Sequence, residues 1–209
     1  MATNPAWVGP RDEVVALVPD RAKRILDVGA SNGTVGEALR QVGKHVTGIE
    51  ILPELAAQAE GRLDEVIVAD VEDLALRGVS PGGPFDCVVM ADVLEHLRDP
   101  WAVVKWATTL LPPDGSLVIS VPNVAHIRTV WNLLGRKRWV YEEFGIFDRT
   151  HLRWFGRANL DGLLTGTGLR IVDLQRKKWL GNPGSPLSRL APYLGDLSTY
   201  QFVFRAERA

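Results

Sequence analysis

Residues 25–36 constrain the fold of this chain more than any other stretch; they read Ile-Leu-Asp-Val-Gly-Ala-Ser-Asn-Gly-Thr-Val-Gly. The opening Ile-Leu-Asp-Val is typical of a buried strand, and Gly29 and Gly33 permit a tight turn before a helix that begins at Thr34. A dinucleotide site is excluded because Ser31 and Thr34 stand where G-x-G-x-x-G requires glycines. No Gly-Lys-Ser/Thr of a phosphate-binding loop follows either.

Asp27 is the charged residue of this segment, at the carboxyl end of the predicted strand, where open α/β sheets bind ligands. A carboxylate there would repel a pyrophosphate, but it suits the ammonium group of an amino-acid-like ligand. Together with Gly29 and Gly33 it matches D-x-G-x-x-x-G, and here the chain resembles the class I S-adenosylmethionine-dependent methyltransferases. The bare pattern also fits an ordinary strand-turn-helix junction with a structural aspartate.

Two more acidic residues end predicted strands farther along the chain. Glu50 closes a strand over 45–50 and follows Gly33 by 17 residues. At about this offset, a carboxylate in a nucleotide-binding unit accepts hydrogen bonds from both ribose hydroxyls. Asp70 ends the next strand, and the resemblance implies that it lies at the adenine edge with Val71 beside the ring.

The fourth predicted strand, 85–90, is followed by Ala-Asp-Val-Leu-Glu-His-Leu-Arg-Asp-Pro. This segment closely resembles the one that follows the same strand in many small-molecule methyltransferases. The resemblance implies a binding site for S-adenosyl-L-methionine formed by Asp27, Gly29, Ala30, Ser31, Gly33, Glu50, Ile51, Asp70, Val71, Ala91 and Asp92.

Strands that alternate with helices predict a mostly parallel sheet. A fifth strand is expected over 116–121, a sixth over 169–175, and a last strand over 197–205 that pairs antiparallel with the sixth. The predicted fold is a Rossmann-like α/β domain with seven strands and helices on both faces, and the whole chain, 1–209, forms one domain. A helix that opens at Pro10 is expected to cover one edge of the sheet.

Two segments, 123–155 and 177–196, are predicted to cover the substrate. The first, inserted after strand five, is too long for an ordinary connection and holds its own helix over about 124–134. The second is irregular and rich in Gly and Pro. The run Asp-Arg-Thr-His-Leu-Arg-Trp-Phe resembles a bacterial subgroup of these methyltransferases that is often linked to glycan or secondary-metabolite pathways.

Methyl transfer from a sulfonium needs alignment in a dry pocket, and an alcohol acceptor also needs a proton acceptor, usually His near neutral pH. His151 is the first candidate, and its alternative role is a hydrogen-bonded anchor of the lid. His96 is the second, and it could instead cap or pack against a helix. His126 comes third, whereas His45 begins a strand far from the ligand-binding end. No cluster shows metal-ligand spacing, so a metal-independent enzyme is expected.

Charge and aromatic residues bear on the acceptor. Residues 1–122 hold 10 Lys and Arg against 18 Asp and Glu, whereas 123–209 hold 14 against 7. The basic half is expected to meet an anionic substrate or surface, unless these charges only solvate the protein. A satellite core, or an aromatic wall for an apolar or sugar-like acceptor, is expected from Trp131, Tyr141, Trp154 and Trp179.

The leading hypothesis is therefore an S-adenosylmethionine-dependent methyltransferase that acts on an oxygen of a small molecule or glycan precursor, with anionic acceptors among the candidates. The alternative is a cofactor-binding domain that regulates or scaffolds a partner enzyme, as the MetW-like proteins do. The lone Cys87, expected to be buried, and the lack of a signal peptide or membrane span favour the cytoplasm. No nucleic-acid partner is expected, and the oligomeric state stays open.

Overall fold

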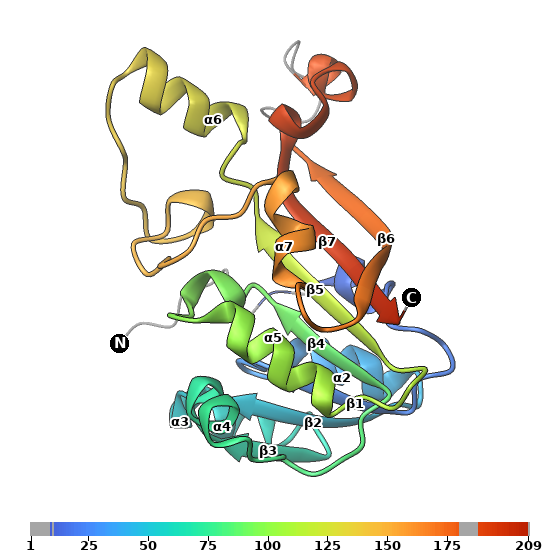
Figure 1. Cartoon of the computed structure of the whole chain (residues 1–209). Helices are drawn as coiled ribbons and strands as arrows, with labels where there is room; N and C mark the ends of the chain where they lie inside the picture. Colours follow the sequence, from blue (N-terminus) through green and yellow to red (C-terminus); the bar gives the residue numbers. More distant parts are fainter. Residues whose placement is uncertain (1–8, 10, 180–187, 209) are drawn as a thin grey trace.

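A computed structural model of the chain describes residues 9, 11–179 and 188–208 (Figure 1). Its centre is a seven-stranded sheet in the order β3-β2-β1-β4-β5-β7-β6. The strands are β1 (Arg24–Val28), β2 (His45–Glu50), β3 (Glu65–Val68), β4 (Cys87–Ala91), β5 (Ser116–Pro122), β6 (Leu169–Lys178) and β7 (Thr199–Arg208). The α-helices are α1 (Asp12–Val15), α2 (Thr34–Gln41), α3 (Pro53–Ala59), α4 (Val71–Arg77), α5 (Pro100–Thr109), α6 (Ile127–Val130) and α7 (Leu160–Leu163).

The strand pairing confirms the predicted fold class. Strands β1 to β5 pair in parallel, and only β7 runs antiparallel to its two neighbours, β5 and β6. Strand β1 pairs with both β2 and β4, so the order of the strands reverses there. In an open α/β sheet, ligands bind outside the carboxyl ends of the strands at such a reversal. The ligand site is therefore expected above the ends of β1 and β4.

The central strands are apolar on both faces because helices cover both sides of the sheet. Within β1, Leu26 and Val28 pack in one hydrophobic cluster with α5 and α7, whereas Ile25 packs in a second cluster with α1, α2 and α3. Side chains alternate between the faces of a strand, which explains this division. Cys87 is fully buried in the second cluster, as predicted.

The N-terminal helix does not cover an edge of the sheet, so that prediction is wrong. Val14 of α1 is fully buried in the same cluster as Val118 of β5 and Val203 of β7. These strands lie inside the strand order, and α1 therefore covers part of a face. Pro5 and Pro10 lie outside the described residues, as do 180–187 of the second predicted insertion.

Helix α4 was not predicted from the sequence. Its first turn is capped by Asp70, whose Oδ1 accepts a hydrogen bond of 2.8 Å from the Glu72 amide. Gly78 ends it in the left-handed conformation, with φ of 63°. The helix was missed because it has only seven residues. Its acidic first turn follows a strand directly, and in the sequence it resembles a loop after that strand.

The insertion 123–155 leaves the sheet and returns to it. After α6 the chain continues in a π-helical turn, η3 (Trp131–Gly135), and this helical segment, yellow in Figure 1, lies apart from the sheet. The returning chain is fixed to the short helix η2 (Leu94–His96), because the amides of Leu152 and Arg153 donate to the Glu95 carbonyl over 2.7 and 3.0 Å. Among the described residues, no helix has the length and apolar character needed to cross a membrane.

Candidate active site

The turn after β1 has the conformation that its glycines predict. Gly29 and Gly33 have φ of 70° and 83°, in the left-handed region that favours glycine. A Cβ atom on Gly29 would lie 2.5 Å from Cγ2 of Val93, and one on Gly33 would lie 3.1 Å from the Ala59 backbone. Close packing as well as conformation therefore requires glycine at both positions.

A cavity of about 520 Å³ lies at the carboxyl ends of β1, β2 and β4. Of the predicted cofactor residues, all but Gly33 line it: Asp27, Gly29, Ala30, Ser31, Glu50, Ile51, Asp70, Val71, Ala91 and Asp92. Gly33 instead lies directly before α2, at its N-cap position, and packs against α3. The cavity has the size of a small-molecule or cofactor site.

Glu50 is held in the cavity wall by the backbone. Its Oε2 accepts a hydrogen bond of 2.8 Å from the Ser31 amide, and its Oε1 accepts one of 2.9 Å from the Leu52 amide. The turn after β1 and the end of β2 are thereby tied together. An ionised carboxylate offers about four lone-pair sites, so Glu50 keeps capacity for two ribose hydroxyls.

Asp27 lies buried at the end of β1, with 2% of its surface exposed. Its Oδ2 has no hydrogen-bond partner among the described residues. Burial, and secondly the charge of Glu50, raise the pKa of Asp27 to about 7. A cationic ligand group would stabilise the ionised form of this carboxyl, so the residue fits an ammonium ligand.

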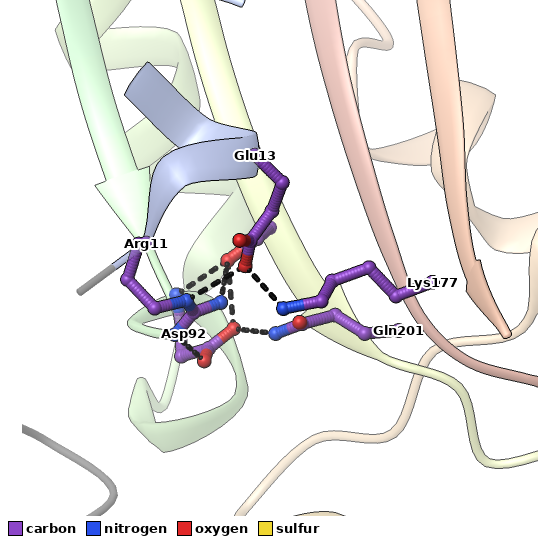
Figure 2. A network of polar contacts seen from close by, with 6 residues as sticks. Arg11, Glu13, Asp92, Lys177 and Gln201 are labelled. Carbon is purple, nitrogen blue, oxygen red and sulfur yellow. Dashed lines mark hydrogen bonds and ion pairs between the residues drawn. The ribbon is translucent and has the colours of Figure 1, made fainter. Parts of the chain in front are cut away.

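Asp92 is held by a network that also reaches the N-terminal segment (Figure 2). Its carboxylate forms an ion pair with Arg11, while Ser120 Oγ and Gln201 Nε2 donate to its Oδ1 over 2.7 and 2.5 Å. Burial alone would raise the pKa of Asp92, but Arg11 and these hydrogen bonds hold it below its usual value. Asp92 thus lines the cavity as a charged residue whose oxygens are already engaged.

Arg11 lines the cavity but was not predicted as a site residue. Its Nε also binds Glu13 Oε1 at 3.0 Å, and the same oxygen contacts Lys177 Nζ at 2.6 Å, so the network joins α1 to β6. No local pattern indicates Arg11, because 81 residues separate it from Asp92.

His96 and His151, the two predicted catalytic residues, lie in contact. Their ring centroids are 4.8 Å apart, with the planes at 70°. His96 lines the cavity, whereas His151 is not among the described residues that line it and is 9% exposed. Burial, and then the neighbouring His96, lower the pKa of His151 to about 4, and burial also lowers the pKa of His96. Both rings are therefore neutral near pH 7.

A hydrogen-bonded chain orients the His96 ring. The Thr150 hydroxyl donates to Oδ1 of Asp148 over 2.6 Å and lies 3.0 Å from Nδ1 of His96. Since the hydroxyl proton points to Asp148, its oxygen accepts from Nδ1–H of the imidazole. A neutral ring with its proton on Nδ1 carries its lone pair on Nε2.

Among the described residues, one group could hold a metal ion. Donor atoms of Glu95, His96 and His151 all lie within 4.8 Å of one another. Oε2 of Glu95 and Nδ1 of His151 are buried and have no hydrogen-bond partner in the part of the chain that the structure describes, and burial raises the pKa of Glu95 well above its usual range. Such donors suit a divalent transition metal. Local spacing could not indicate this group, and the metal-independent enzyme expected from the sequence stays a prediction.

The third histidine candidate has a structural position. The Arg128 amide donates to Nδ1 of His126 over 3.2 Å, and Nε2 donates to the Trp179 carbonyl over 2.8 Å. His126 thus caps α6 and joins the first insertion to the end of β6. His45 lies at the start of β2, away from the cavity, as expected.

None of the four predicted wall aromatics is among the described residues that line the cavity. Trp154 packs edge-to-face on Trp139 at 6.0 Å, and Trp139 packs in the same way on Phe147 at 5.2 Å. Trp154 thus contacts an aromatic cluster, but 48% of its surface is exposed. Trp131 and Tyr141 are largely exposed instead.

The match to known families bears directly on this cavity. Residues 9–174 match a family model described as a methyltransferase domain, and this range includes every residue that lines the cavity. The chain belongs to the methyltransferase domain family. It is a class I S-adenosylmethionine-dependent methyltransferase, as its motifs indicated, and S-adenosylmethionine is the cofactor of this family.

Curated relatives support the same family. The methyltransferase is 38% identical over 128 residues to the ubiquinone biosynthesis O-methyltransferase of Xanthomonas campestris pv. campestris (strain B100). The matched region covers 58% of this chain and 51% of that protein. It is 37% identical over 126 residues to the protein of the same name from Xylella fastidiosa (strain 9a5c), covering 58% and 50%. The chain thus spans about half the length of these relatives.

Solved structures share the fold of this methyltransferase. A SAM-dependent methyltransferase from Archaeoglobus fulgidus superposes with a TM-score of 0.68 at 18% identity, over 97% of this chain and 96% of that one. Magnesium protoporphyrin IX methyltransferase from Synechocystis PCC 6803, with bound SAH, gives a TM-score of 0.67 at 18% identity, over 95% and 81%. At these identities the likeness concerns the fold alone.

Proposed function

We propose that this methyltransferase transfers the methyl group of S-adenosylmethionine to an oxygen atom of a small-molecule or glycan-precursor acceptor. One observation carries the proposal: a single cavity of about 520 Å³ is lined by the three acidic strand-end residues and by His96. A cofactor-binding scaffold would need the acidic residues but not the histidine. The name of the curated relatives, O-methyltransferase, supports oxygen over nitrogen.

The cofactor half of the proposal assigns a role to each acidic residue. Asp27, buried and without a hydrogen-bond partner for Oδ2 in the described part of the chain, pairs with the ammonium of the methionine moiety. Glu50, oriented by two backbone amides, binds the ribose hydroxyls. Asp70 accepts from the adenine amine through Oδ2, since Oδ1 caps α4, and Val71 lies against the ring.

The chemical half of the proposal concerns the acceptor proton. In-line transfer of the methyl group removes the positive charge from the cofactor sulfur. A dry cavity that aligns the reacting atoms therefore favours the reaction. An acceptor hydroxyl must also lose its proton. We assign this proton to His96, because it lines the cavity, and we assign His151 a positioning role behind it. The sequence favoured His151 over His96 as the base, and this assignment reverses that preference.

The first insertion contributes to the acceptor site through its returning chain. Within 123–155, the residues that line the cavity are Thr150 and Leu152, and no residue of α6 or η3 lines it. We therefore propose that the acceptor contacts the returning chain near these two residues. The role of 177–196 as a second cover stays a prediction.

The test is turnover of the purified protein with a panel of hydroxylated acceptors that includes phenols, sugars and carboxylated alcohols. Methylated product from at least one oxygen acceptor, lost in a His96→Ala variant that still binds the cofactor, is the expected result. Transfer only to amines, or undiminished transfer by His96→Ala, would contradict the proposal.

A further inference from the structure

The helical segment 126–135 buries three polar residues and exposes three large apolar ones. His126, Thr129 and Asn132 recur every three residues along one side and are at most 6% exposed. Trp131 and Leu134 are 62% and 77% exposed. A surface helix of a globular protein normally has the opposite arrangement, with its apolar stripe facing the core. The outward face of this segment is therefore built to contact something other than water.

Exposed and partly exposed apolar residues of the segment together form a hollowed surface rather than scattered side chains. Ile127, Val130, Trp131, Leu134 and Gly135 line one shallow apolar depression along the segment. Leu133 of the same segment is also exposed, as are Tyr141 and Phe144 farther along the insertion. An apolar surface of this kind marks an interaction site more often than a solvated face.

Three consecutive cations follow this apolar face directly: Arg136, Lys137 and Arg138. All three are exposed, and none forms an ion pair with another described residue. The other arginines at this end of the insertion differ, since Arg128 pairs with Glu142 at 2.7 Å and Arg149 pairs with Glu143 at 2.5 Å. The cations beside the apolar face are thus available to an external anion.

We propose that residues 127–138 form a docking surface for an anionic lipid bilayer, with the apolar face entering the interfacial region and the three cations contacting phosphate head groups. The element combines an amphipathic helix, an exposed Trp and a basic cluster, which together characterise peripheral membrane binding. Figure 1 shows this helical segment projecting away from the sheet. The proposal goes beyond the methyl-transfer activity and does not depend on it.

A second copy of the chain is a less suitable occupant. In a two-fold dimer the same patch faces itself, so the two Arg136–Arg138 stretches would meet near the interface. Six like charges without partners in the described structure would oppose that contact. A lipid surface supplies many anions at once and avoids this repulsion.

The experiment is cosedimentation of the full chain with vesicles of phosphatidylcholine alone and of phosphatidylcholine mixed with phosphatidylglycerol. We expect binding to the mixed vesicles that weakens as salt is raised, and little binding to the neutral ones. A double variant, Trp131→Ser with Leu134→Ser, and a triple variant, Arg136→Gln with Lys137→Gln and Arg138→Gln, should each bind at least about tenfold more weakly.

Matched controls change equally exposed residues outside the insertion. Leu76→Ser alters an exposed leucine of α4, and a triple change of Lys23, Lys105 and Arg170 to Gln removes three exposed cations. These variants should keep vesicle binding, and every variant should keep the thermal unfolding temperature of the parent protein.

Three outcomes would overturn the proposal. The first is a parent protein that binds neither vesicle. The second is a control triple variant that loses as much vesicle binding as the variant of Arg136, Lys137 and Arg138. Binding would then depend on the overall charge of the protein rather than on this surface. The third is a dimer in solution that Leu134→Ser dissociates while no vesicle binding occurs, which would assign the face to a second copy.

Discussion

The ring of His96, which lines the cavity, and the ring of His151 lie edge to face with their centroids 4.8 Å apart. They come from two segments that lie 55 residues apart in the sequence, and they meet because the returning chain of the insertion donates hydrogen bonds to the Glu95 carbonyl. The pair joins the part of the cavity formed by the sheet to the part formed by the insertion.

Replacement of each histidine separates their roles. His96→Ala is expected to lower kcat by about 100-fold or more while leaving the cofactor dissociation constant nearly unchanged, as for a lost general base. His151→Ala should lower kcat less, and it should change the pH profile through the orientation of His96. Steady-state kinetics and calorimetry on both variants provide the measurement.

A larger loss of kcat in His151→Ala than in His96→Ala would move the base to His151, the residue that the sequence favoured. A loss of thermal stability in His151→Ala that matches the loss of activity would assign it only an anchoring role. Full activity in both variants would mean that proximity and desolvation suffice, without a histidine base.

Metal removal tests the group formed by Glu95, His96 and His151. If His96 accepts the proton directly, prolonged treatment with a chelator should leave turnover unchanged, because no ion takes part. Activity that disappears with the chelator and returns with Zn²⁺ or Mn²⁺ would instead make these residues metal ligands. Glu95→Gln would then lose the metal while retaining the cofactor site.

Cofactor affinity should depend on pH through Asp27. Its pKa in the folded protein is about 7, above the ordinary value of 3.8, so the folded protein binds a proton that the unfolded chain has released between these pH values. Asp27 therefore lowers the free energy of unfolding as pH rises through this window. Since the cofactor ammonium requires the ionised carboxylate, affinity should rise with pH and level off above about 7.

Calorimetry over a pH series, in buffers of different ionisation enthalpy, would check this and should detect proton release on binding near pH 7. In Asp27→Asn the pH dependence should vanish, with weak affinity throughout and a more stable free protein above pH 7. An affinity that does not change between about pH 6 and 8 would remove Asp27 from the ammonium site.

Gly29→Ala should destabilise the protein by about 2–4 kcal/mol, through left-handed strain and contact with Val93 at the cavity wall. Gly43→Ala is a matched control, because Gly43 has φ of 81° but no atom within 4 Å of the added Cβ. It should cost only the strain, about 1–2 kcal/mol. Denaturant unfolding measures both, and equal losses would refute the role of Val93.

The sequence was informative wherever a local pattern decides the structure. Apolar runs located all seven strands, and Glu50 was placed by its position at the end of one of them. The turn at Gly29 and Gly33 was predictable because only glycine adopts its conformation at low cost.

Contacts between distant segments could not be predicted in this way. The Arg11–Asp92 ion pair and the His96–His151 contact depend on which segments the fold brings together, and single-residue patterns carry no such information. The prediction that the N-terminal helix covers an edge of the sheet was wrong for the same reason. The helix predicted at about 124–134 shows a further limit, because the sequence pattern did not indicate that Trp131 and Leu134 would be exposed.

The most direct test of the account is calorimetric titration of the purified protein with S-adenosylmethionine, beside Glu50→Ala and Glu50→Gln. The parent protein should bind one equivalent of cofactor. Glu50→Ala should bind more weakly by about 1–3 kcal/mol, and Glu50→Gln, which keeps one oxygen for the backbone amides, should lose less. A folded parent protein that binds no cofactor at millimolar concentration would contradict the assignment of the cavity.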